Sequence, residues 1–409
     1  MSLPNTPSSN SSARGITSSI KVGVRVRPFN DRERSSANCV SLTPDSLSVI
    51  CPDLSGSKNQ DVSRTFQFDH LFPESSCQHD IYDSIGQPIL EKFIEGHSCA
   101  VLAYGQTGSG KTFTMQGCKD SPGLIPNLLT DLYTSHVNQL SKSSTFEITA
   151  SYLEIYMENV RDLLSNDTDY SQLLKIVDLG PPHGIQVSNL SKHPIKSMKD
   201  VQKLLSIGES RRMTGSTKMN DVSSRSHAVF CLYLKQQLKN DKEGFSTRFS
   251  KLFLVDLAGS ERVGDAGTSG IGLKEGTNIN KSLSALASVV TSIVKNQPHV
   301  PYRDSKLTRL LQDAFSFGVT SMLCNISPSS MCFDETLSTL RFADRAQKIK
   351  LHSVVRRDPA AQKIAELKEE IEELKGYVTR IESSFCLPFR KPVDRPSGLA
   401  ERQRSCVIL

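Results

Sequence analysis

Gly105-Gln-Thr-Gly-Ser-Gly-Lys-Thr112 is the stretch that decides the fold, because it matches the pattern G-x-x-x-x-G-K-[ST] and directly follows the apolar run Cys99–Tyr104. A glycine-rich loop between a strand and a helix presents backbone N–H groups to phosphate at the positive end of the helix. The lysine of such a loop reaches the β and γ phosphates, and its threonine hydroxyl binds Mg²⁺. A glycine-rich turn without a ligand is the alternative. We therefore predict a nucleotide site made by Gly105, Gln106, Thr107, Gly108, Ser109, Gly110, Lys111 and Thr112.

The composition places the chain among ordinary globular proteins. Its 409 residues, 37% of them hydrophobic and 22% charged, are enough for one large domain with appendages or for two domains. The net charge of +6 fits a surface for an acidic partner, although such an excess is often spread over a solvated surface. The cysteines form no C-x-x-C pair and no Cys/His group with zinc spacing, which indicates reduced thiols. Neither a signal peptide nor a run of about 18 apolar residues is found, so we expect a soluble, intracellular protein.

Strand-like and helix-like patterns alternate over most of the chain. Residues 1–19 are rich in Ser, Asn and Pro and are predicted to be a disordered extension. The alternation then predicts one α/β domain over residues 20–350, with a central, mostly parallel or mixed sheet flanked by helices. A strand is expected from Ile20 to Pro28, and further strands at Phe146–Ile155, Ala228–Leu238, Phe249–Leu257 and Ser321–Ile326. Helices are expected at Asp80–Glu95, Lys199–Gly208, Asn278–Lys295 and Ser305–Ala314.

Residues 360–385 carry a different pattern, in which apolar side chains recur every three or four positions. This spacing predicts a short coiled coil that would form a homodimer through residues 364–385. An amphipathic helix folded back on the domain is the alternative, since Gly376 costs about 1 kcal/mol of helix propensity and three heptads are near the lower limit for a coil. The residues of the seam are Ile364, Leu367, Ile371, Leu374, Val378, Ile381 and Phe385.

Two polar segments supply candidates for sensing the γ-phosphate. The cluster Asn220–His227 leads into a predicted strand, and Leu254–Arg262 is a strand that ends in Asp256. An aspartate at a strand end suits a Mg²⁺ role through water, and Gly259 can offer its backbone N–H to the phosphate. Arg225 and Glu261 form an obvious ion pair for closing the site. Taken singly, either cluster is equally a structural turn.

In this order and at these separations, GQTGSGKT, N-x-x-SSRSH and DLAGSE resemble the kinesin motor domain. The likeness extends from IKVGVRVRP through KEGTNINKSLSAL (274–286) and VPYRDSKLTRLLQD (300–313) to LRFADRAQKIK (340–350), and so covers about residues 20–360. The resemblance implies a P-loop NTPase-type motor domain over 20–350 that binds ATP and Mg²⁺. The adenine side would be formed by Arg25, Arg27, Pro28 and Phe113.

The resemblance also assigns roles to the two polar segments. Ser224 and Arg225 match the first switch, where Ser224 would position the attacking water or Mg²⁺. Asp256, Gly259 and Glu261 match the second switch, and Glu261 paired with Arg225 would pass on a proton from the water. Mg²⁺ would be held by Thr112 directly and by Ser224 and Asp256 through water. Catalysis would then consist mostly of positioning and charge stabilisation.

Microtubules are the partner that the resemblance implies, with a location in the cytoplasm on the cytoskeleton, and no nucleic-acid partner is expected. The basic residues in the matching segments are Lys274, Lys281, Arg303, Lys306 and Arg309. By their spacing alone, the last three would more readily be a solvated helix face, and it is the resemblance that favours a binding role. Asp265 and Asn159 stand where relatives often carry basic residues, and Ser316–Val319 replaces a glycine-rich turn. We therefore expect ordinary or weak electrostatic attachment to the track.

Residues 351–359 stand in the place of the family's neck linker. A motor domain followed by such a linker usually steps towards the plus end, although Leu351 and Arg356 replace asparagines that often fix the docked linker. A microtubule-binding or bundling protein with little movement is therefore the alternative. A further alternative is a different P-loop switch enzyme, which the VPYRDSKLTRLL segment disfavours.

Residues 386–409 are expected to be a basic, disordered tail that ends in Cys406-Val-Ile-Leu409. This ending matches C-a-a-X with a leucine that favours geranylgeranyl, which makes Cys406 a lipidation candidate and the membrane a possible partner. Nearby arginines and Lys391 would supply the second, basic signal that stable anchoring needs. An accidental match at the end of the chain is the alternative.

Overall fold

The computed structural model describes residues 16–50, 63–165, 173–180, 183–214, 224–238, 247–261, 271–357, 367 and 370–381. The chain divides into two units, Met1–Ala361 and Gln362–Leu409. No helix among the described residues is long and apolar enough to cross a membrane.

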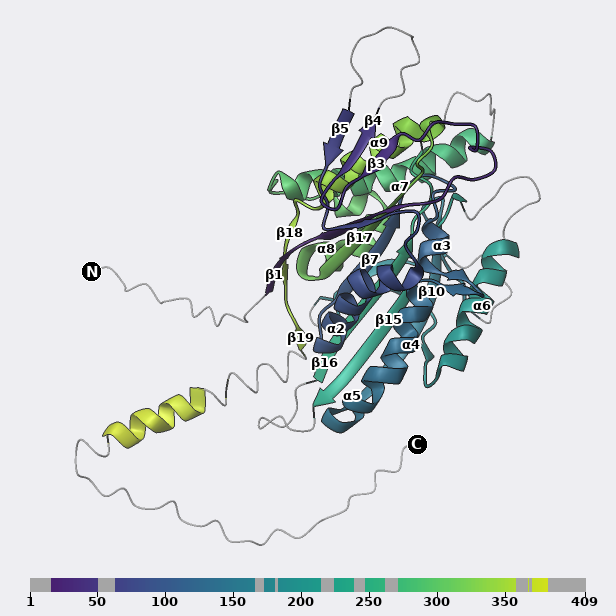
Figure 1. The fold of residues 1–409 in the computed structure, drawn as a ribbon. Coiled ribbons are helices and arrows are strands. Elements are labelled where there is room, and N and C mark those ends of the chain that lie inside the picture. The colour runs from purple at the N-terminus through teal and green to yellow at the C-terminus, as the bar shows by residue number, and fades with distance from the viewer. Residues whose placement is uncertain are drawn as a thin grey trace, which may run out of the picture. The chain divides into compact units, whose positions relative to one another are not determined.

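A mixed sheet forms the centre of the first unit (Figure 1). The strands β16, β7, β17, β2 and β6 pair in parallel, whereas β11, β10 and β15 pair antiparallel, as β15 does with β16. This arrangement confirms the predicted mixed sheet of an α/β domain. In order across the sheet, the strands are β11 (Asn159–Asp162), β10 (Ser144–Tyr156), β15 (His227–Leu238), β16 (Thr247–Asp256), β7 (Cys99–Tyr104), β17 (Val319–Ile326), β2 (Lys21–Val26) and β6 (His70–Phe72).

Helices cover both faces of the sheet. One face carries α7 (Ile271–Val294), α8 (Lys306–Phe317) and α9 (Phe333–Ala346). The other carries α1 (Gln78–Ile81), η1 (Tyr82–Gly86), α2 (Gln87–Glu95), α4 (Leu124–Asp131), η2 (Leu132–His136), α5 (Val137–Ser143) and α6 (Met198–Thr214). All four predicted helices are present, but α7 begins seven residues before the predicted Asn278.

The apolar strand β7 shows why the sheet needs two helical layers. Ala100, Leu102 and Tyr104 belong to the core on the α7–α9 side, while Cys99, Val101 and Ala103 belong to the core on the α2–α6 side. A parallel strand buried on both faces reads as a continuous apolar run, because successive side chains point to opposite faces. The loop that follows β7 therefore leaves the sheet from its most buried strand.

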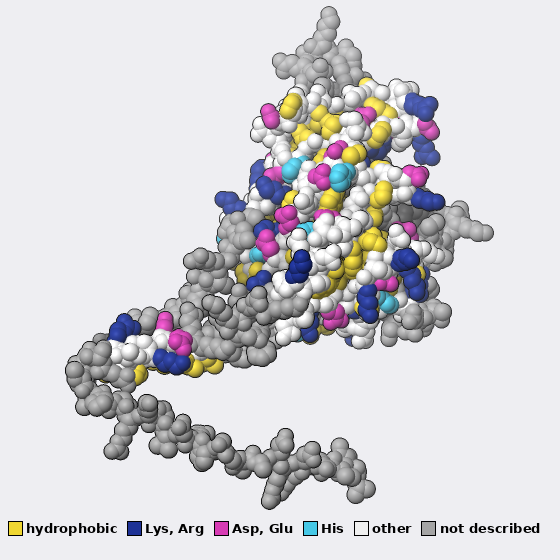
Figure 2. All heavy atoms as spheres, turned by 60° about the horizontal axis from the view of Figure 1, so that its bottom comes forward, with side chains coloured by type: hydrophobic (Ala, Val, Ile, Leu, Met, Phe, Trp, Pro, Cys, Tyr) yellow, Lys and Arg dark blue, Asp and Glu magenta, His cyan; other side chains and the backbone are white. Residues whose placement is uncertain are grey.

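Smaller elements accompany the strands and helices named above. These are β3 (Val40–Leu42), β4 (Leu47–Ile50), β5 (Ser63–Phe66), α3 (Lys111–Met115), β8 (Gly117–Cys118), β9 (Ser121–Pro122), β12 (Ile176–Asp178), β13 (Ile185–Val187), β14 (His193–Pro194), η4 (Tyr302–Asp304) and η5 (Ser330–Cys332). One of them, β14, pairs antiparallel with β10 of the main sheet. In Figure 2, which looks onto the lower side of Figure 1, cationic and anionic side chains are interspersed among apolar ones. The basic excess is therefore not gathered into one patch on that face.

The prediction that residues 1–19 are disordered is wrong for the last four of them. Ile16–Ser19 form strand β1, which pairs antiparallel with β18 (Lys350–Ser353), so that Ile16 lies opposite Ser353 and Ser19 opposite Lys350. The polar composition of this segment gave no strand signal, and β18, the partner that the described residues supply, lies more than 330 positions away in the sequence. Residues 1–15 lie outside the described residues.

The segment predicted as a linker, 351–359, is ordered over most of its length. After β18, the pair β19 (Arg356–Arg357) joins β16 opposite Arg248 and Phe249. The backbone N–H of Val354 donates to the carbonyl of Phe317, at 3.2 Å. The chain from Lys350 to Arg357 is thus held along the domain by backbone pairing on both sides of Val354.

In the second unit, residues 370–381 are helical, which agrees with the helix expected within 360–385. The seam side chains described there are exposed, from 41% for Ile381 to 57% for Leu374. Pairing with a second copy stays a prediction. The tail 386–409, with Cys406, lies outside the described residues.

Candidate active site

The glycine-rich loop joins β7 to α3 as the sequence predicts. Gly105, Gly108 and Gly110 have φ values of +147°, +73° and +99°, a region that side-chain-bearing residues rarely adopt. A Cβ atom on Gly105 would lie 2.2 Å from the carbonyl oxygen of Asn325, whereas the space beside Gly108 and Gly110 is open. The loop therefore packs tightly against β17 at its start and leaves room for a ligand at its end, as phosphate binding requires.

Lys111, the first residue of α3, is buried and points back into the loop. Its ammonium group donates to the carbonyls of Gly105 at 2.9 Å and Gln106 at 2.7 Å. Burial lowers the pKa of Lys111, while the nearby carboxylates of Asp256 and Glu261 raise it. The lysine is thus a desolvated cation held by loop carbonyls, close to two carboxylates and ready to meet an anionic ligand.

The residues predicted to bind Mg²⁺ lie together. Thr112 donates its hydroxyl to Oδ2 of Asp256 at 2.7 Å, and Asp256 is buried at the carboxyl end of β16. The other oxygen of Asp256, Oδ1, is buried without a hydrogen-bond partner. A buried, unsatisfied carboxylate oxygen beside a threonine hydroxyl fits a site for Mg²⁺ and its bound water, because the ion prefers oxygen ligands.

Arg212 is a site residue that sequence reasoning missed. It comes from α6, is buried, and donates to Asp256 Oδ2 at 3.1 Å and to the carbonyl of Ser226 at 3.3 Å. Its guanidinium also lies 4.0 Å from the buried carboxylate of Glu154 on β10. The cation therefore balances two buried carboxylates behind the residues predicted to bind Mg²⁺. Nothing in the local sequence Ser210–Thr214 distinguishes Arg212 from the solvated arginines of a helix end.

Backbone and side-chain contacts join the two predicted switch segments and the loop. The N–H of Gly259 donates to the carbonyl of Ser224 at 2.9 Å, and the N–H of Ser260 donates to the carbonyl of Gly105 at 3.1 Å. Glu261 accepts from the backbone N–H of Thr107 at 2.7 Å and also from the Thr107 hydroxyl. The contacts described for Glu261 are thus with the loop, and its pairing with Arg225, which lies half-buried beside Ser224, stays a prediction.

His227 links the same switches to helix α7. Its Nδ1 accepts from the N–H of Ala258 at 3.0 Å, which leaves Nε2 to donate to the hydroxyl of Ser282 at 2.6 Å. Complete burial, together with the charges of Arg212 and Lys111, lowers the pKa of His227 to about 3. The imidazole is therefore neutral. The position of His227 at the end of the polar cluster was the available signal, but no role was predicted for it.

The predicted adenine side is formed by Arg25, Phe113 and their neighbours. The guanidinium of Arg25 lies 5.2 Å from the centre of the Phe113 ring, and that ring is 43% exposed. Arg25 also donates to Gln78 at 3.0 Å and to the hydroxyl of Thr114 at 2.9 Å. Burial lowers the pKa of Arg25. A half-exposed aromatic ring beside a fixed guanidinium is suited to stacking against a nucleotide base.

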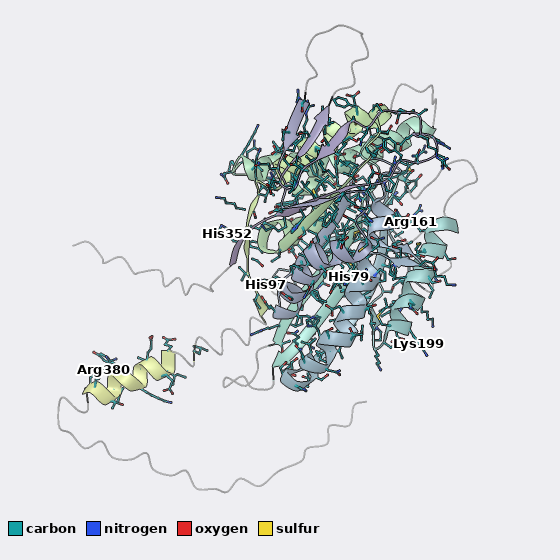
Figure 3. All side chains as sticks on the ribbon, viewed as in Figure 1. His79, His97, Arg161, Lys199, His352 and Arg380 are labelled. Atoms are coloured by element: carbon teal, nitrogen blue, oxygen red, sulfur yellow. The ribbon has the colours of Figure 1, made fainter. Side chains whose placement is uncertain are left out.

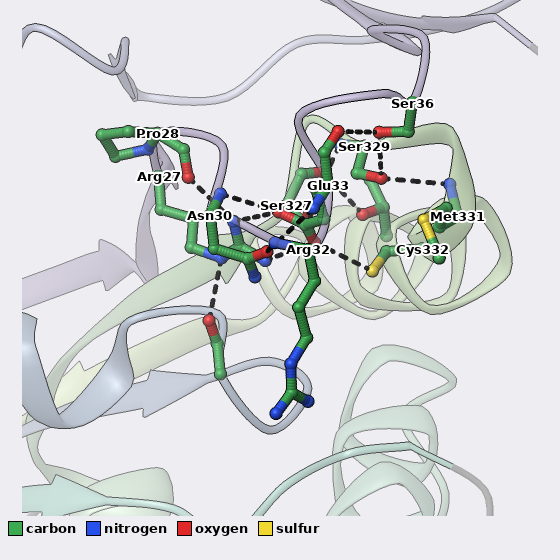
Figure 4. A network of polar contacts seen from close by, with 12 residues as sticks. Arg27, Pro28, Asn30, Arg32, Glu33, Ser36, Ser327, Ser329, Met331 and Cys332 are labelled. Carbon is green, nitrogen blue, oxygen red and sulfur yellow. Dashed lines mark hydrogen bonds and ion pairs between the residues drawn. The ribbon is translucent and has the colours of Figure 1, made fainter.

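Arg27 fixes the loop to a polar network (Figure 4). Its Nε donates to the carbonyl of Gly108 at 2.8 Å, its Nη1 to the carbonyl of Pro28, and both Nη atoms to the carboxylate of Glu33 at 2.6 Å. Glu33 in turn accepts from the hydroxyl of Ser327 at 3.1 Å. The hydrogen bonds of Arg27 hold the pKa of Glu33 down at about 2. Arg27 and Pro28 therefore support the loop, and the sequence alone had predicted them only as adenine-side residues.

The basic residues predicted to bind microtubules differ in the exposure and contacts of their side chains. Lys281, Arg303 and Lys306 are exposed on α7, on η4 and at the start of α8. Arg309 is half-buried, donates to Gln312 at 2.5 Å and lies 3.4 Å from Asp178. The side chain of Lys274 and all of Asp265 lie outside what the structure describes.

Comparison with known proteins is consistent with this geometry. The family model described as "Kinesin motor domain" matches residues 25–349. The chain is 42% identical over 408 residues to mouse kinesin-like protein KIF13A, which covers 94% of this chain and 23% of that protein. It is 39% identical over 387 residues to human kinesin-like protein KIF1B, which covers 88% of this chain and 21% of that protein. The chain thus spans less than a quarter of the length of these curated relatives.

Solved structures give the same result. A two-heads-bound dimer of KIF14 residues 391–772, with AMP-PNP and in complex with a microtubule, matches with a TM-score of 0.77 and 34% identity, over 86% of this chain and 100% of that one. A structure described as that of a fast kinesin matches with a TM-score of 0.73 and 38% identity, over 83% of this chain and 94% of that one.

The first prediction concerns Arg212. Replacing it (Arg212→Met) leaves the buried carboxylates of Asp256 and Glu154 without their cation, so we expect the free energy of unfolding in urea to fall by about 3–5 kcal/mol. The matched control is Lys203→Met, an exposed lysine on the same helix, for which we expect a change within about 0.5 kcal/mol. Equal stability of the two variants would contradict the assigned role.

The second prediction concerns Glu33. Its folded-state pKa of about 2 lies below the ordinary value of 4.5, so the ionised carboxylate stabilises the fold above pH 4.5 and this contribution is lost as the pH falls towards 2. The shift corresponds to about 3 kcal/mol at neutral pH. We therefore expect Glu33→Gln to be less stable than the parent protein at pH 7 by about this amount, and the gap to narrow at pH 3. Urea unfolding at both pH values measures it, and a gap of constant size would argue against the assignment.

Proposed function

The chain belongs to the kinesin motor-domain family, and on this premise we propose that it binds ATP with Mg²⁺, hydrolyses ATP, and uses the cycle to move along microtubules. The observation that carries the proposal is a series of contacts from the phosphate loop to the second switch, and from the second switch to the first. Thr112 meets Asp256, Thr107 meets Glu261, and Gly259 meets Ser224. A ligand that replaces these hydrogen bonds would therefore act on the second switch directly and on the first switch through Gly259.

ATP would be held by the loop from Gly105 to Thr112, with its base against Phe113 and Arg25. Lys111 would exchange the carbonyls of Gly105 and Gln106 for phosphate oxygens. Mg²⁺, held by Thr112 and through water by Asp256 and Ser224, would neutralise the charge that develops on the phosphates. The cation Arg212 would hold the carboxylate of Asp256 in place for this role through its hydrogen bond to Oδ2 at 3.1 Å.

Hydrolysis would rest on the positions of Ser224, Gly259 and Glu261. The water oxygen forms a bond to the γ-phosphorus while the bond from that phosphorus to the bridging oxygen breaks, giving ADP and phosphate. Ser224 orients the water, Gly259 offers its N–H to the γ-phosphate, and Glu261, paired with Arg225, accepts the proton that the water releases. For this arrangement, Gly259 must leave the carbonyl of Ser224 and Glu261 must leave Thr107. The exchange of these hydrogen bonds would be the sensing step.

The pair His227–Ser282 supplies a route from the site to the track-facing helix. His227 accepts from the N–H of Ala258, which lies beside Gly259, and donates to Ser282 on α7. Lys281 is next in sequence to Ser282 and is exposed. A movement of the second switch is thus passed through one neutral imidazole to the helix that carries a predicted microtubule contact.

The ordered segment from Lys350 to Arg357 favours a motor over a protein that only binds or bundles microtubules. It pairs with β1 and β16 although it lacks the asparagines expected to fix it. Since a segment that docks and releases can move whatever follows it, we propose stepping with plus-end direction. Dimerisation through 364–385 and membrane anchoring through Cys406 stay part of the proposal and rest on the sequence pattern alone.

The third prediction tests microtubule-stimulated ATP hydrolysis. We expect turnover to rise when microtubules are added and to be lost in Lys111→Ala, because this variant lacks the lysine that would bind the phosphates. Lys306→Ala should raise the microtubule concentration needed for half-maximal stimulation by several-fold, because it removes an exposed cation from the proposed docking surface. Lys199→Ala, an exposed lysine on α6 across the sheet (Figure 3), is the matched control and should leave that concentration unchanged.

A gliding assay on the same protein separates motor from binder. Directed gliding towards the plus end is the expected result, and stimulated hydrolysis without gliding would favour the binding or bundling reading. Turnover that microtubules fail to increase would refute both.

The fourth prediction concerns Ser282→Ala, which removes the acceptor of His227 Nε2. We expect ATP turnover without microtubules to stay within about twofold and the maximal stimulation by microtubules to fall several-fold, because the link between switch and helix is cut while the loop is intact. Ser288→Ala, on the exposed face of the same helix, should leave stimulation unchanged. A normal stimulation in Ser282→Ala would rule out this route.

A further inference from the structure

Helix α2 ends beside the segment Lys350–Arg357, and one side-chain hydrogen bond joins them. Nδ1 of His97, two residues after the last residue of α2, lies 2.7 Å from the hydroxyl of Ser353 on β18. His97 is 4% exposed and Ser353 is 0% exposed. Figure 3 shows His97 near the end of α2, and His352, the neighbour of Ser353, on β18. A buried polar pair therefore fastens the segment to the domain by its side chains.

The surroundings of His97 fit the segment closely. A Cβ atom on Gly96 would lie 3.0 Å from the side chain of Val355, and one on Gly318 would lie 2.6 Å from the carbonyl of Ser98. Gly318 follows Phe317, whose carbonyl accepts from Val354. The turn after α2, the end of α8 and the segment therefore pack against one another around the imidazole. Release of the segment would remove Ser353 and Val355 from this turn and expose His97 to water.

The charges around His97 disfavour a proton there. Burial is the main cause that lowers the pKa of His97, and Lys92 on α2 and Arg248 on β16 lower it further, while Glu95 raises it. Glu95 lies 3.8 Å from Nε2 but also binds Lys92 at 2.7 Å, which weakens its attraction for an added proton. In the docked arrangement the imidazole is therefore neutral.

We propose that His97 and Ser353 form a proton-sensitive latch, which positions residues 350–357 along the sheet and releases them when His97 is protonated. The local part of the proposal, docking of the segment, stands without any track. Its consequence, that acid lowers the fraction of motors in the docked state, rests on the proposed function.

The direction follows from proton linkage. His97 titrates at an ordinary value near pH 6.5 once exposed, and at a lower pH when docked. The undocked state therefore binds protons more tightly, so docking is fully favoured above pH 6.5 and is weakened as the pH falls below it. At pH 5.5, a histidine with a pKa of 6.5 has about ten protonated copies for each neutral one. The equilibrium constant for docking can therefore fall by at most about tenfold.

Hydrogen exchange followed by mass spectrometry on the full chain tests the latch. The probe is the amide protection of residues 349–357, corrected for the chemical exchange rate at each pH. For the parent protein we expect protection to fall by up to about tenfold from pH 7.5 to pH 5.5, while β7 (Cys99–Tyr104) stays protected. His97→Asn keeps a polar side chain that cannot titrate, so its protection should be nearly independent of pH.

Two further variants separate a latch from a merely structural histidine. Ser353→Ala removes the partner and should lower protection of 349–357 at pH 7.5 by several-fold. His299→Asn, at an exposed histidine outside the contact, should keep the acid response of the parent protein. The proposal is overturned if His97→Asn responds to acid as the parent protein does, if the parent protein does not respond, or if β7 loses protection to the same extent. No ATP or microtubule is needed, so these results are independent of whether the chain is a motor.

Discussion

The buried carboxylate of Asp256 is the group on which the active site depends. It ends β16, a strand in the middle of the sheet that is parallel to β7 and antiparallel to β15, and it accepts from Thr112 and pairs with Arg212. An ionised carboxylate in such a place is stable only with a cation and hydrogen-bond donors around it. Meeting that need brings the first residues of α3, the second switch and α6 to one point, although they are separated by up to 144 residues in the chain. Oδ1 of Asp256 has no hydrogen-bond partner, and as an acceptor it suits the water shell of a metal ion.

From this point, polar contacts run outward on both sides of the loop. Arg27 and Glu33 tie Gly108 to Ser327, six residues before α9, which leads to Lys350. His227 ties the second switch to α7. Each link is a small set of hydrogen bonds centred on a buried or half-buried side chain, so a change of ligand at the loop can shift these hydrogen bonds without disturbing the apolar cores. The domain therefore combines a rigid sheet with a small number of polar connections to its surface elements.

The segment after α9 illustrates how the fold orders a stretch that its own sequence does not. Residues 350–357 have neither a strong strand pattern nor the asparagines expected to fix them. They are held by backbone pairing with Ile16–Ser19 and with β16, and by the contact of Ser353 with His97. Each of these contacts contributes little on its own. A single protonation or a shift of α9 can therefore change the equilibrium between the attached and released states of the segment.

The sequence by itself determined the α/β class, the loop from Gly105 to Thr112 and the two switch segments, because glycine spacing, apolar runs and polar clusters are local properties of the chain. It also placed the four helices of the core to within a few residues at most ends. The tertiary structure alone decided that Arg212 balances Asp256, that Arg309 is engaged with Asp178, that Ile16–Ser19 is a strand, and that His97 meets Ser353. These facts concern partners far apart in sequence. Burial and pairing, which order such residues, exist only once the sheet has brought the partners together.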